Sequence, residues 1–246
     1  MLHEDRLINS VSDLLQFLKS DWIDNKFLWF RGQRDIDWEL KPSIARDDLL
    51  NKENMLIKRF KQVVSPHLVG PVPQTPWDWI FLMQHHGAPT RLLDWTESPL
   101  VGLYFAIVKD AETDAALWCL DPISLNEASK IKYNFELELP AFEADDKILQ
   151  NYLPERLDPV IELLPIAVIG QRNSPRMIAQ SGTFTINHLK NISIDQIGTQ
   201  KHIWRYIIPK ESRKTIREEL RLLGYSELKI FPGLDVAGRS VAKELC

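Results

Sequence analysis

The sequence predicts a single α/β domain (α+β in its order of elements) with a central mixed sheet and flanking helices. Two observations lead to this prediction. Apolar segments of helical length alternate with segments of strand length along 246 residues, and no linker, internal repeat or low-complexity block divides the chain. The composition, with 44% hydrophobic and 26% charged residues, is that of an ordinary globular protein. We therefore expect one domain over residues 1–246, with its core at about 10–236.

Apolar residues at helical spacing, bounded by capping residues, predict a series of helices. They are expected at residues 11–18, 49–64, 77–86, 99–107 and 212–223. Gly87 and Gly224 are suited to C-terminal caps. Ser98 followed by Pro99 is suited to a helix start. Gln84 shares the apolar face of its helix, so its side chain should point inward.

Runs of β-branched and aromatic residues predict the strands. They are expected at residues 27–30, 115–120, 166–169, 183–186, 203–208 and 228–231. The first run, FLWF, is apolar throughout, so it should be buried on both faces at the centre of the sheet. Its expected neighbour is the strand at 203–208. The charged stretch 123–159 gives no clear pattern, and we assign no element there.

Charge, cysteine content and hydropathy exclude several classes of protein. Thirty basic and 34 acidic residues give a net charge of −4, which argues against a global basic surface for duplex nucleic acid. Cys119 and Cys246 are too few for a disulfide framework and lack metal-binding spacing, so we expect reduced thiols. The N-terminus lacks a signal peptide's apolar core, and no apolar run could span a bilayer. A cytoplasmic location without a membrane partner is expected.

The segment FLWFRGQ places Arg31 directly after an apolar strand, with Gln33 close behind it. A partly buried arginine at the end of a strand needs a negatively charged partner. That partner is either an internal carboxylate or an anionic ligand, and the sequence leaves both open.

The segment QHHGAPTRLLDWTESPLVGLYFA concentrates polar residues between two predicted helices. Its candidate site residues are Gln84, His85, Thr90, Arg91, Asp94, Thr96 and Glu97. We interpret it as a loop in which Arg91, Thr96 and the N-terminus of the next helix grip a phosphate. Alternatively, Arg91 and Asp94 pair with each other. His85 and His86 have no third ligand at a metal-binding spacing, so no metal site is predicted.

Several motifs of the chain resemble the FRG domain family, which is named for its Phe-Arg-Gly motif and is mostly bacterial and phage-associated. They are FRG within FLWFRGQ, ELKPSIAR at 39–46, the long segment at 84–106, AQSGTF at 179–184 and FPGLD at 231–235. The long segment is the specific part of this resemblance, which names the domain and leaves its chemistry open.

The order of the motifs is also similar to that of the ADP-ribosyltransferase fold, and this similarity implies NAD as substrate. In those enzymes a first arginine holds the NAD phosphates or a ribose, a middle Ser or Thr shapes the nicotinamide pocket, and a glutamate stabilises the oxocarbenium-like transition state. Arg31 matches the first part and Thr90 or Thr96 the second. Gln180 stands where the glutamate is expected, and an amide carries no charge.

Three functional hypotheses follow. The first is an NAD-dependent ADP-ribosyltransferase-like enzyme, such as a toxin or phage-defence effector, with an unknown protein or nucleic-acid acceptor. Its candidate catalytic residues are Asp94, Glu97 and Gln180, and its candidate NAD-binding residues are Arg31, Gln33, Gln84, His85, Thr90, Arg91 and Thr96. The second is a non-catalytic domain that binds a nucleotide or nucleic acid. The third is a metal-dependent hydrolase or nuclease that uses Asp94, His85 and His86.

Overall fold

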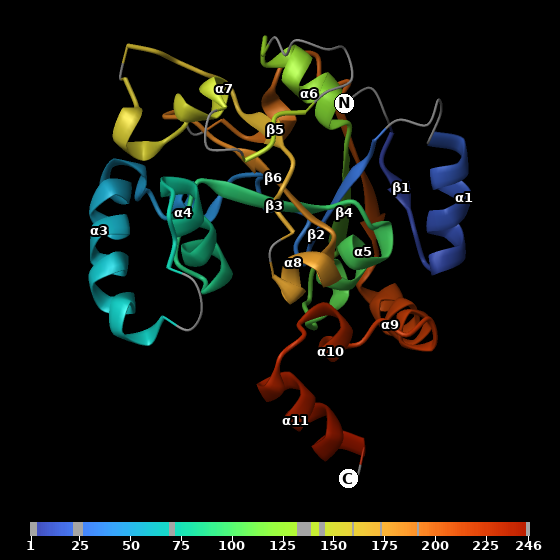
Figure 1. Cartoon of the computed structure of the whole chain (residues 1–246). Coiled ribbons are helices and arrows are strands. Elements are labelled where there is room, and N and C mark those ends of the chain that lie inside the picture. The colour runs from blue at the N-terminus through green and yellow to red at the C-terminus, as the bar shows by residue number, and fades with distance from the viewer. Residues whose placement is uncertain are drawn as a thin grey trace.

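A seven-stranded mixed sheet forms the centre of the computed structural model, with helices around it (Figure 1). The structure describes residues 4–21, 27–68, 72–131, 139–142, 146–158, 160–172, 174–190 and 192–244. The strands are β1 (Arg6–Leu7), β2 (Trp29–Gln33), β3 (Leu92–Thr96), β4 (Ala115–Leu120), β5 (Ile166–Val168), β6 (Gly182–Ile186) and β7 (Ile203–Ile208). Their order in the sheet is β1-β7-β4-β2-β3-β6-β5. The predicted α/β class with a central mixed sheet is confirmed.

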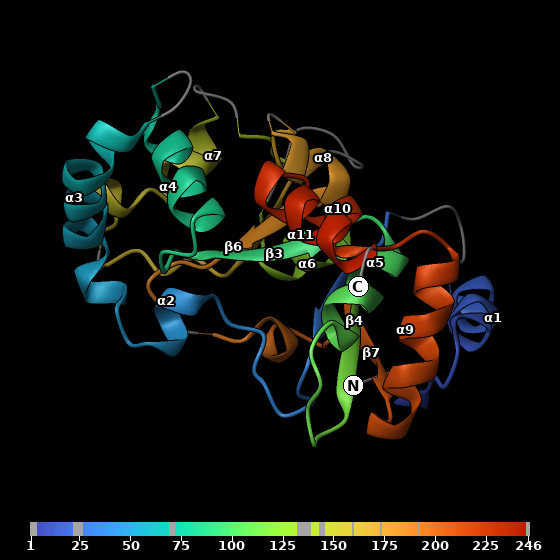
Figure 2. The same ribbon diagram turned by 90° about the horizontal axis from the view of Figure 1, so that it is seen from below.

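Helices surround this sheet. They are α1 (Val11–Asp21), α2 (Ser43–Arg46), α3 (Glu53–Val64), α4 (Pro76–His85), α5 (Pro99–Ile107), α6 (Pro122–Ala128), α7 (Lys147–Gln150), α8 (Pro175–Gln180), α9 (Arg213–Leu222), α10 (Glu227–Ile230) and α11 (Leu234–Glu244). Figures 1 and 2 show α3 and α4 toward one end of the molecule and α1 and α9 toward the other. No helix in the described part of the chain has the length and apolarity that a bilayer crossing requires.

The predicted helix boundaries agree with the capping chemistry. Thr75 and Asp78 form a capping box at the start of α4, in which each side chain accepts a hydrogen bond from the other residue's backbone N–H. The Ser98 hydroxyl accepts from the Val101 N–H at 3.4 Å at the start of α5. Gly87 and Gly224 have positive φ angles, 76° and 79°, which glycine adopts without strain. The sequence therefore located these helix ends correctly.

β2 is central, as predicted, but its expected neighbour was wrong. It pairs with β4 on one side and with β3 on the other, both antiparallel, and β4 separates it from β7. β4 is buried along its whole length and pairs with all six residues of β7, so it occupies the place that we assigned to β2. β2 also begins at Trp29, whereas Phe27 precedes the strand and is 60% exposed.

Two further predictions are corrected. The segment that we interpreted as a polar loop contains β3, which pairs with β6 from Leu92 and Ile186 to Thr96 and Gly182. Its partner lies far away in sequence, and Asp94 interrupts the apolar pattern that identifies a strand. The strand expected at 228–231 is the short helix α10, because the Ser226 hydroxyl accepts from the Lys229 N–H and starts a helical turn.

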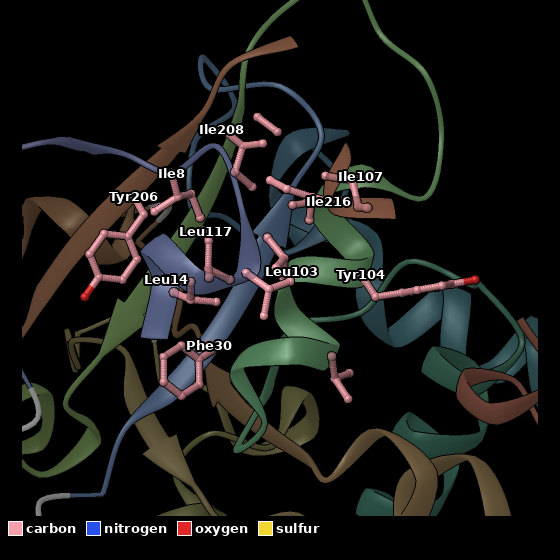
Figure 3. Close-up of a cluster of buried hydrophobic side chains, with 14 of the residues drawn as sticks. Ile8, Leu14, Phe30, Leu103, Tyr104, Ile107, Leu117, Tyr206, Ile208 and Ile216 are labelled. Carbon is pink, nitrogen blue, oxygen red and sulfur yellow. The ribbon is translucent and has the colours of Figure 1, made fainter. Parts of the chain in front are cut away.

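The core lies on both faces of the sheet, since successive residues of β4 point to opposite sides. Leu117 and Cys119 pack in a cluster with α5 and α9, while Trp118 and Leu120 pack in a second cluster with α6. Figure 3 shows the first cluster, where Phe30, Leu103 and Leu117 converge from β2, α5 and β4. Cys119 is a buried free thiol, as predicted, and Cys246 lies outside the described residues.

Helix α5 crosses β2 at very short range because glycines face each other at the contact. A Cβ atom added to Gly32 would lie 2.1 Å from the Gly102 carbonyl oxygen and 2.4 Å from the Ala106 nitrogen. A Cβ atom added to Gly102 would lie 2.9 Å from the Phe30 Cβ. The glycine of the Phe-Arg-Gly motif is thus required for the backbone of α5 to rest on the strand.

Arg91, directly before β3, forms a buried ion pair with Glu53 of α3. Its Nε donates to both carboxylate oxygens at 3.0 Å, its Nη2 also donates to Glu53, and its Nη1 donates to the Asn187 carbonyl oxygen at 3.2 Å. The two side chains are 0% and 3% exposed. The alternative in which Arg91 pairs with Asp94 is therefore wrong, because Glu53 takes that place and ties α3 to the sheet.

We expect Gly32→Ala to lower the free energy of unfolding by about 3 kcal/mol or more, because its methyl group would collide with backbone atoms of α5 that cannot move independently. Gly233→Ala is the control, since a Cβ there meets no heavy atom within 4 Å. It should change stability by no more than about 0.5 kcal/mol. Urea unfolding measures both, and a Gly32→Ala protein as stable as wild type would show that the close approach is dispensable.

Glu53→Gln should destabilise the protein by about 3–5 kcal/mol, because Arg91 would remain buried without a counter-charge. The double variant Glu53→Leu, Arg91→Met removes both charges and should cost clearly less than the sum of the two single variants. A double-mutant cycle by chemical unfolding checks this. If the destabilisations of the two single variants simply added up in the double variant, Glu53 and Arg91 would not interact directly.

Candidate functional site

Two neighbouring cavities lie where β2 and β3 part. The strands pair at Phe30 and Thr96, and from Arg31 onward the described residues of β2 pair with β4 alone. We call the larger cavity, of 520 Å³, the α4 cavity, because Phe81, Gln84 and His85 of α4 line it. The smaller one, of 330 Å³, is the α5 cavity; its walls include Arg31, Arg34, Trp38, Thr96, Gly102 and Phe105. Asp94, Arg176 and Gln180 line both.

Arg31 lines the α5 cavity with most of its hydrogen-bonding capacity unused. Its Nη1 donates to the Asp94 carbonyl oxygen at 2.7 Å, and its buried Nε has no hydrogen-bond partner. No carboxylate oxygen of the described residues lies within 4.0 Å of its guanidinium. Burial lowers the pKa of Arg31 to about 10, against the raising effect of Asp94, and Arg46 lowers it further. Arg31 therefore stays cationic at neutral pH and can bind an anion.

Asp94 supplies the carboxylate that both cavities share. It is the exposed residue of β3, because its side chain faces the cavities and not the core. Gln84 Nε2 donates to Asp94 Oδ2 at 2.7 Å. The surrounding protein still desolvates this carboxylate, and that burial raises the pKa of Asp94 although Arg31, Gln84 and Arg176 oppose the rise.

Four predicted site residues, Gln33, Thr90, Arg91 and Glu97, lie outside both cavities. Arg91 is saturated by Glu53 in the core. Gln33 ends β2 beside β4 and is buried; it accepts a hydrogen bond from Trp118 Nε1 at 2.7 Å and donates to the Glu39 carbonyl oxygen. Glu97 forms a surface ion pair with Arg172. The structure thus places Gln33, Arg91 and Glu97 away from the cavities, and each is bound to another part of the protein.

Thr90 and Thr96 are buried and hydrogen-bonded within the protein. Thr90 Oγ1 donates to Gln84 Oε1. Thr96 lines the α5 cavity, yet its hydroxyl donates to the Gln180 carbonyl oxygen at 2.6 Å and accepts from the Ser98 N–H at 3.0 Å. With Arg91 absent from the cavity and Ser98 capping α5, the expected phosphate grip by Arg91, Thr96 and the helix end is not formed.

Gln180 and His85 do reach the cavities. Gln180 Nε2 donates to the Ile230 carbonyl oxygen at 3.1 Å, so its amide links α8 to the end of α10. His85 lines the α4 cavity, and its pKa is lowered by burial and by the charges of Arg176 and His86. Within the described residues, no group of three His, Cys, Asp or Glu side chains could hold a metal ion.

Arg176 lines both cavities, although it is not among the site residues predicted from the sequence. Its guanidinium lies 5.1 Å from the centre of the Phe231 ring, and its Nη1 donates to the His85 carbonyl oxygen at 3.2 Å. Figure 2 shows α8 and α10 side by side, and they are in contact. The sequence does carry a signal for the helix that holds Arg176, because Ser174 is suited to an N-cap and Pro175 to the first helical position.

The site can bind an anion and stabilise a cation. Arg31, Arg34, Lys109 and Arg176 line the α5 cavity, and Asp94 is its carboxylate. Cationic side chains in a partly desolvated cavity bind phosphate groups through charge-assisted hydrogen bonds. A carboxylate at the boundary of two cavities can stabilise positive charge that develops on a ligand spanning them.

Comparisons with known proteins support one of the two resemblances. A family model described as FRG domain matches residues 26–115. No curated protein and no solved structure matches the chain. The matched segment includes β2, α4, β3 and α5, and so it holds most of the cavity walls; the remaining lining residues lie at 171–184, in and around α8 and β6. The resemblance to the FRG domain family is thus confirmed over residues 26–115, the segment that carries Arg31, Gln84 and Asp94.

Proposed function

We propose that this chain is an NAD-dependent ADP-ribosyltransferase-like enzyme. The observation that carries the proposal is that Arg31 and the Asp94 carboxylate line the same cavity without forming an ion pair with each other. Arg31 has free donors and no carboxylate within ion-pair distance among the described residues, which suits a pyrophosphate ligand. Asp94 has a carboxylate that opens toward the same ligand.

The dimensions of the site suit a dinucleotide. Cavities that bind small molecules have volumes of about 300–1,000 Å³, and the two cavities measure 520 and 330 Å³ and share a wall. Trp38 and Phe105 supply aromatic surface to the α5 cavity, and Phe81 and Phe184 supply it to the α4 cavity. These rings suit the nicotinamide and adenine bases at either end of the molecule.

In the proposed reaction, the bond between the ribose anomeric carbon and the nicotinamide nitrogen breaks, and its electron pair leaves with nicotinamide. The ribosyl group then carries positive charge, and the Asp94 carboxylate stabilises it. A nucleophile of the acceptor forms the new bond to the anomeric carbon and releases its proton to solvent. Arg31 holds the pyrophosphate so that the reacting carbon lies near Asp94.

The sheet order also supports the ADP-ribosyltransferase similarity. Arg31 lies on β2, Thr96 ends β3, and Gln180 directly precedes the turn into β6. β2, β3 and β6 are successive neighbours in the sheet, so three motifs that are far apart in sequence meet at one site. This arrangement has the order of parts that the resemblance implies. An enzyme of this kind would serve as a toxin or phage-defence effector in the cytoplasm.

One observation favours a second candidate, a non-catalytic nucleotide-binding domain. Gln180 stands where the resemblance expects a glutamate, and its amide is engaged with the Ile230 carbonyl oxygen. Incubation with NAD labelled in the adenosine moiety, with and without cell lysate, separates the two candidates. Release of nicotinamide supports the enzyme, and binding without release supports the second candidate. Nuclease and protease digestion of labelled product then identifies the acceptor as nucleic acid or protein.

Arg31→Ala should leave the unliganded melting temperature close to that of wild type, because no internal carboxylate loses its partner. It should weaken NAD binding by about 1.5–3 kcal/mol, and Arg31→Lys should recover only part of that loss, since lysine lacks the planar fork. Arg91→Ala is the matched control and should lower the melting temperature strongly. Thermal melts with and without NAD test this, and a large destabilisation by Arg31→Ala would assign Arg31 a structural role.

Asp94→Asn should abolish nicotinamide release while NAD binding is retained, because the amide keeps the shape and loses the charge. The wild-type rate should fall as pH drops through the pKa of Asp94, since only the ionised carboxylate stabilises the cation. Burial raises that pKa, so the acidic limb of the pH profile should lie above the ordinary value of 3.8. Full activity of Asp94→Asn would remove Asp94 from the mechanism.

A further inference from the structure

We propose that Gln84 and Thr90 are positioning residues that orient the Asp94 carboxylate, and that their amide and hydroxyl groups bind within the protein and not to the ligand. The importance of this role for catalysis rests on the proposed function, in which Asp94 stabilises the ribosyl cation. The hydrogen bonds themselves hold whether or not NAD is the substrate.

A chain of hydrogen bonds leads from the backbone of β3 to the carboxylate. The Leu92 N–H donates to Thr90 Oγ1 at 3.2 Å, and Thr90 Oγ1 donates to Gln84 Oε1. Gln84 Nε2 then donates to Asp94 Oδ2 at 2.7 Å. The chain starts and ends on the same strand and passes through α4, so it fixes the helix relative to the strand.

The chemistry of the groups allows one direction for this chain. The Leu92 N–H can only donate, so Thr90 Oγ1 accepts there and has its single proton free for Gln84. Gln84 must then turn its carbonyl oxygen to Thr90 and its NH₂ group to Asp94. An ionised carboxylate accepts hydrogen bonds and cannot donate them, so the chain favours the ionised form of Asp94.

Thr90 has a fixed position from which it can orient Gln84. It is 1% exposed, its N–H donates to Ser43 Oγ at 3.3 Å, and its carbonyl oxygen accepts from the Ile44 N–H at 3.3 Å. Both contacts come from α2 and use the backbone of Thr90. Its side chain is therefore left to bind Gln84, and it is too buried to meet a ligand.

Gln84 is the side chain that donates to the Asp94 carboxylate. It occupies Oδ2, and a backbone hydrogen bond of Asp94 itself also stabilises the carboxylate. The charged groups that act on the carboxylate are Arg31 of β2 and Arg176 of α8, while α4 contributes the neutral Gln84. Gln84 therefore orients the carboxylate through Oδ2, while the carboxylate still borders both cavities.

The pKa of Asp94, followed by ¹³C NMR of its carboxyl carbon in the unliganded protein, tests the role directly. Gln84→Met should raise this pKa by about one pH unit, because a hydrogen bond to the ionised carboxylate is lost. Thr90→Val should also raise it, because Gln84 is then no longer held in place. Thr90→Ser keeps the hydroxyl and should restore the wild-type value. Gln62→Met removes an exposed amide on α3, away from the cavities, and should change nothing.

NAD binding and turnover separate positioning from ligand contact. A positioning role predicts that kcat for nicotinamide release falls about tenfold in Gln84→Met while the Kd for NAD changes less than about twofold. An unchanged Asp94 pKa in both Gln84→Met and Thr90→Val would overturn the proposal, as would a weaker Kd with an unchanged pKa. Should Gln84→Met fail to fold, the Thr90→Val and Thr90→Ser pair decides. If wild type neither binds nor cleaves NAD, the proposed function fails, while the titration still decides the positioning role.

Discussion

The contact between Gly32 and the backbone of α5 is the constraint on which the rest of the site depends. It holds α5 directly against β2, so that Gly102 and Phe105 become walls of the cavity that Arg31 lines. A Cβ atom at Gly32 would lie 2.1 Å from the Gly102 carbonyl oxygen, so any side chain there would push the helix away from the strand. In the Phe-Arg-Gly motif, Phe30 packs in the core, Gly32 allows α5 to contact the strand closely, and Arg31 places a positive charge in the α5 cavity.

Two arginines near the neighbouring strands β2 and β3 have different surroundings. Arg31 lies in β2, and Arg91 directly precedes β3. Arg91 is fully buried, and Glu53 together with a backbone carbonyl satisfies its donors. Arg31 has a buried Nε without a partner and no carboxylate at ion-pair distance among the described residues. A buried charge is costly when it is unpaired. Arg91 stabilises the fold, whereas Arg31 keeps donors that no other described residue uses.

The C-terminal segment completes the site from a distance in sequence. The Ile230 carbonyl oxygen holds the amide of Gln180, and the Phe231 ring packs on Arg176 and on Phe105. These contacts fix the two residues of α8 that line both cavities. The family match at residues 26–115 covers the strands and helices that carry Arg31, Gln84 and Asp94, and α8 with α10 closes the remaining side.

The sequence by itself determined the α/β class, most helix ends, the inward direction of Gln84 and the candidacy of Arg31 and Asp94, because these depend on local periodicity, capping and charge. It could not distinguish the role of Arg31 from that of Arg91, and it could not predict strand β3. Both depend on partners that are far away in sequence. Three features were decided only when the sheet brought distant segments together. They are the ion pair of Arg91 with Glu53, the position of β4 between β2 and β7, and the position of Arg176 in the site. Tertiary structure assigns such roles, since whether a charged side chain is satisfied or left open is a property of its surroundings.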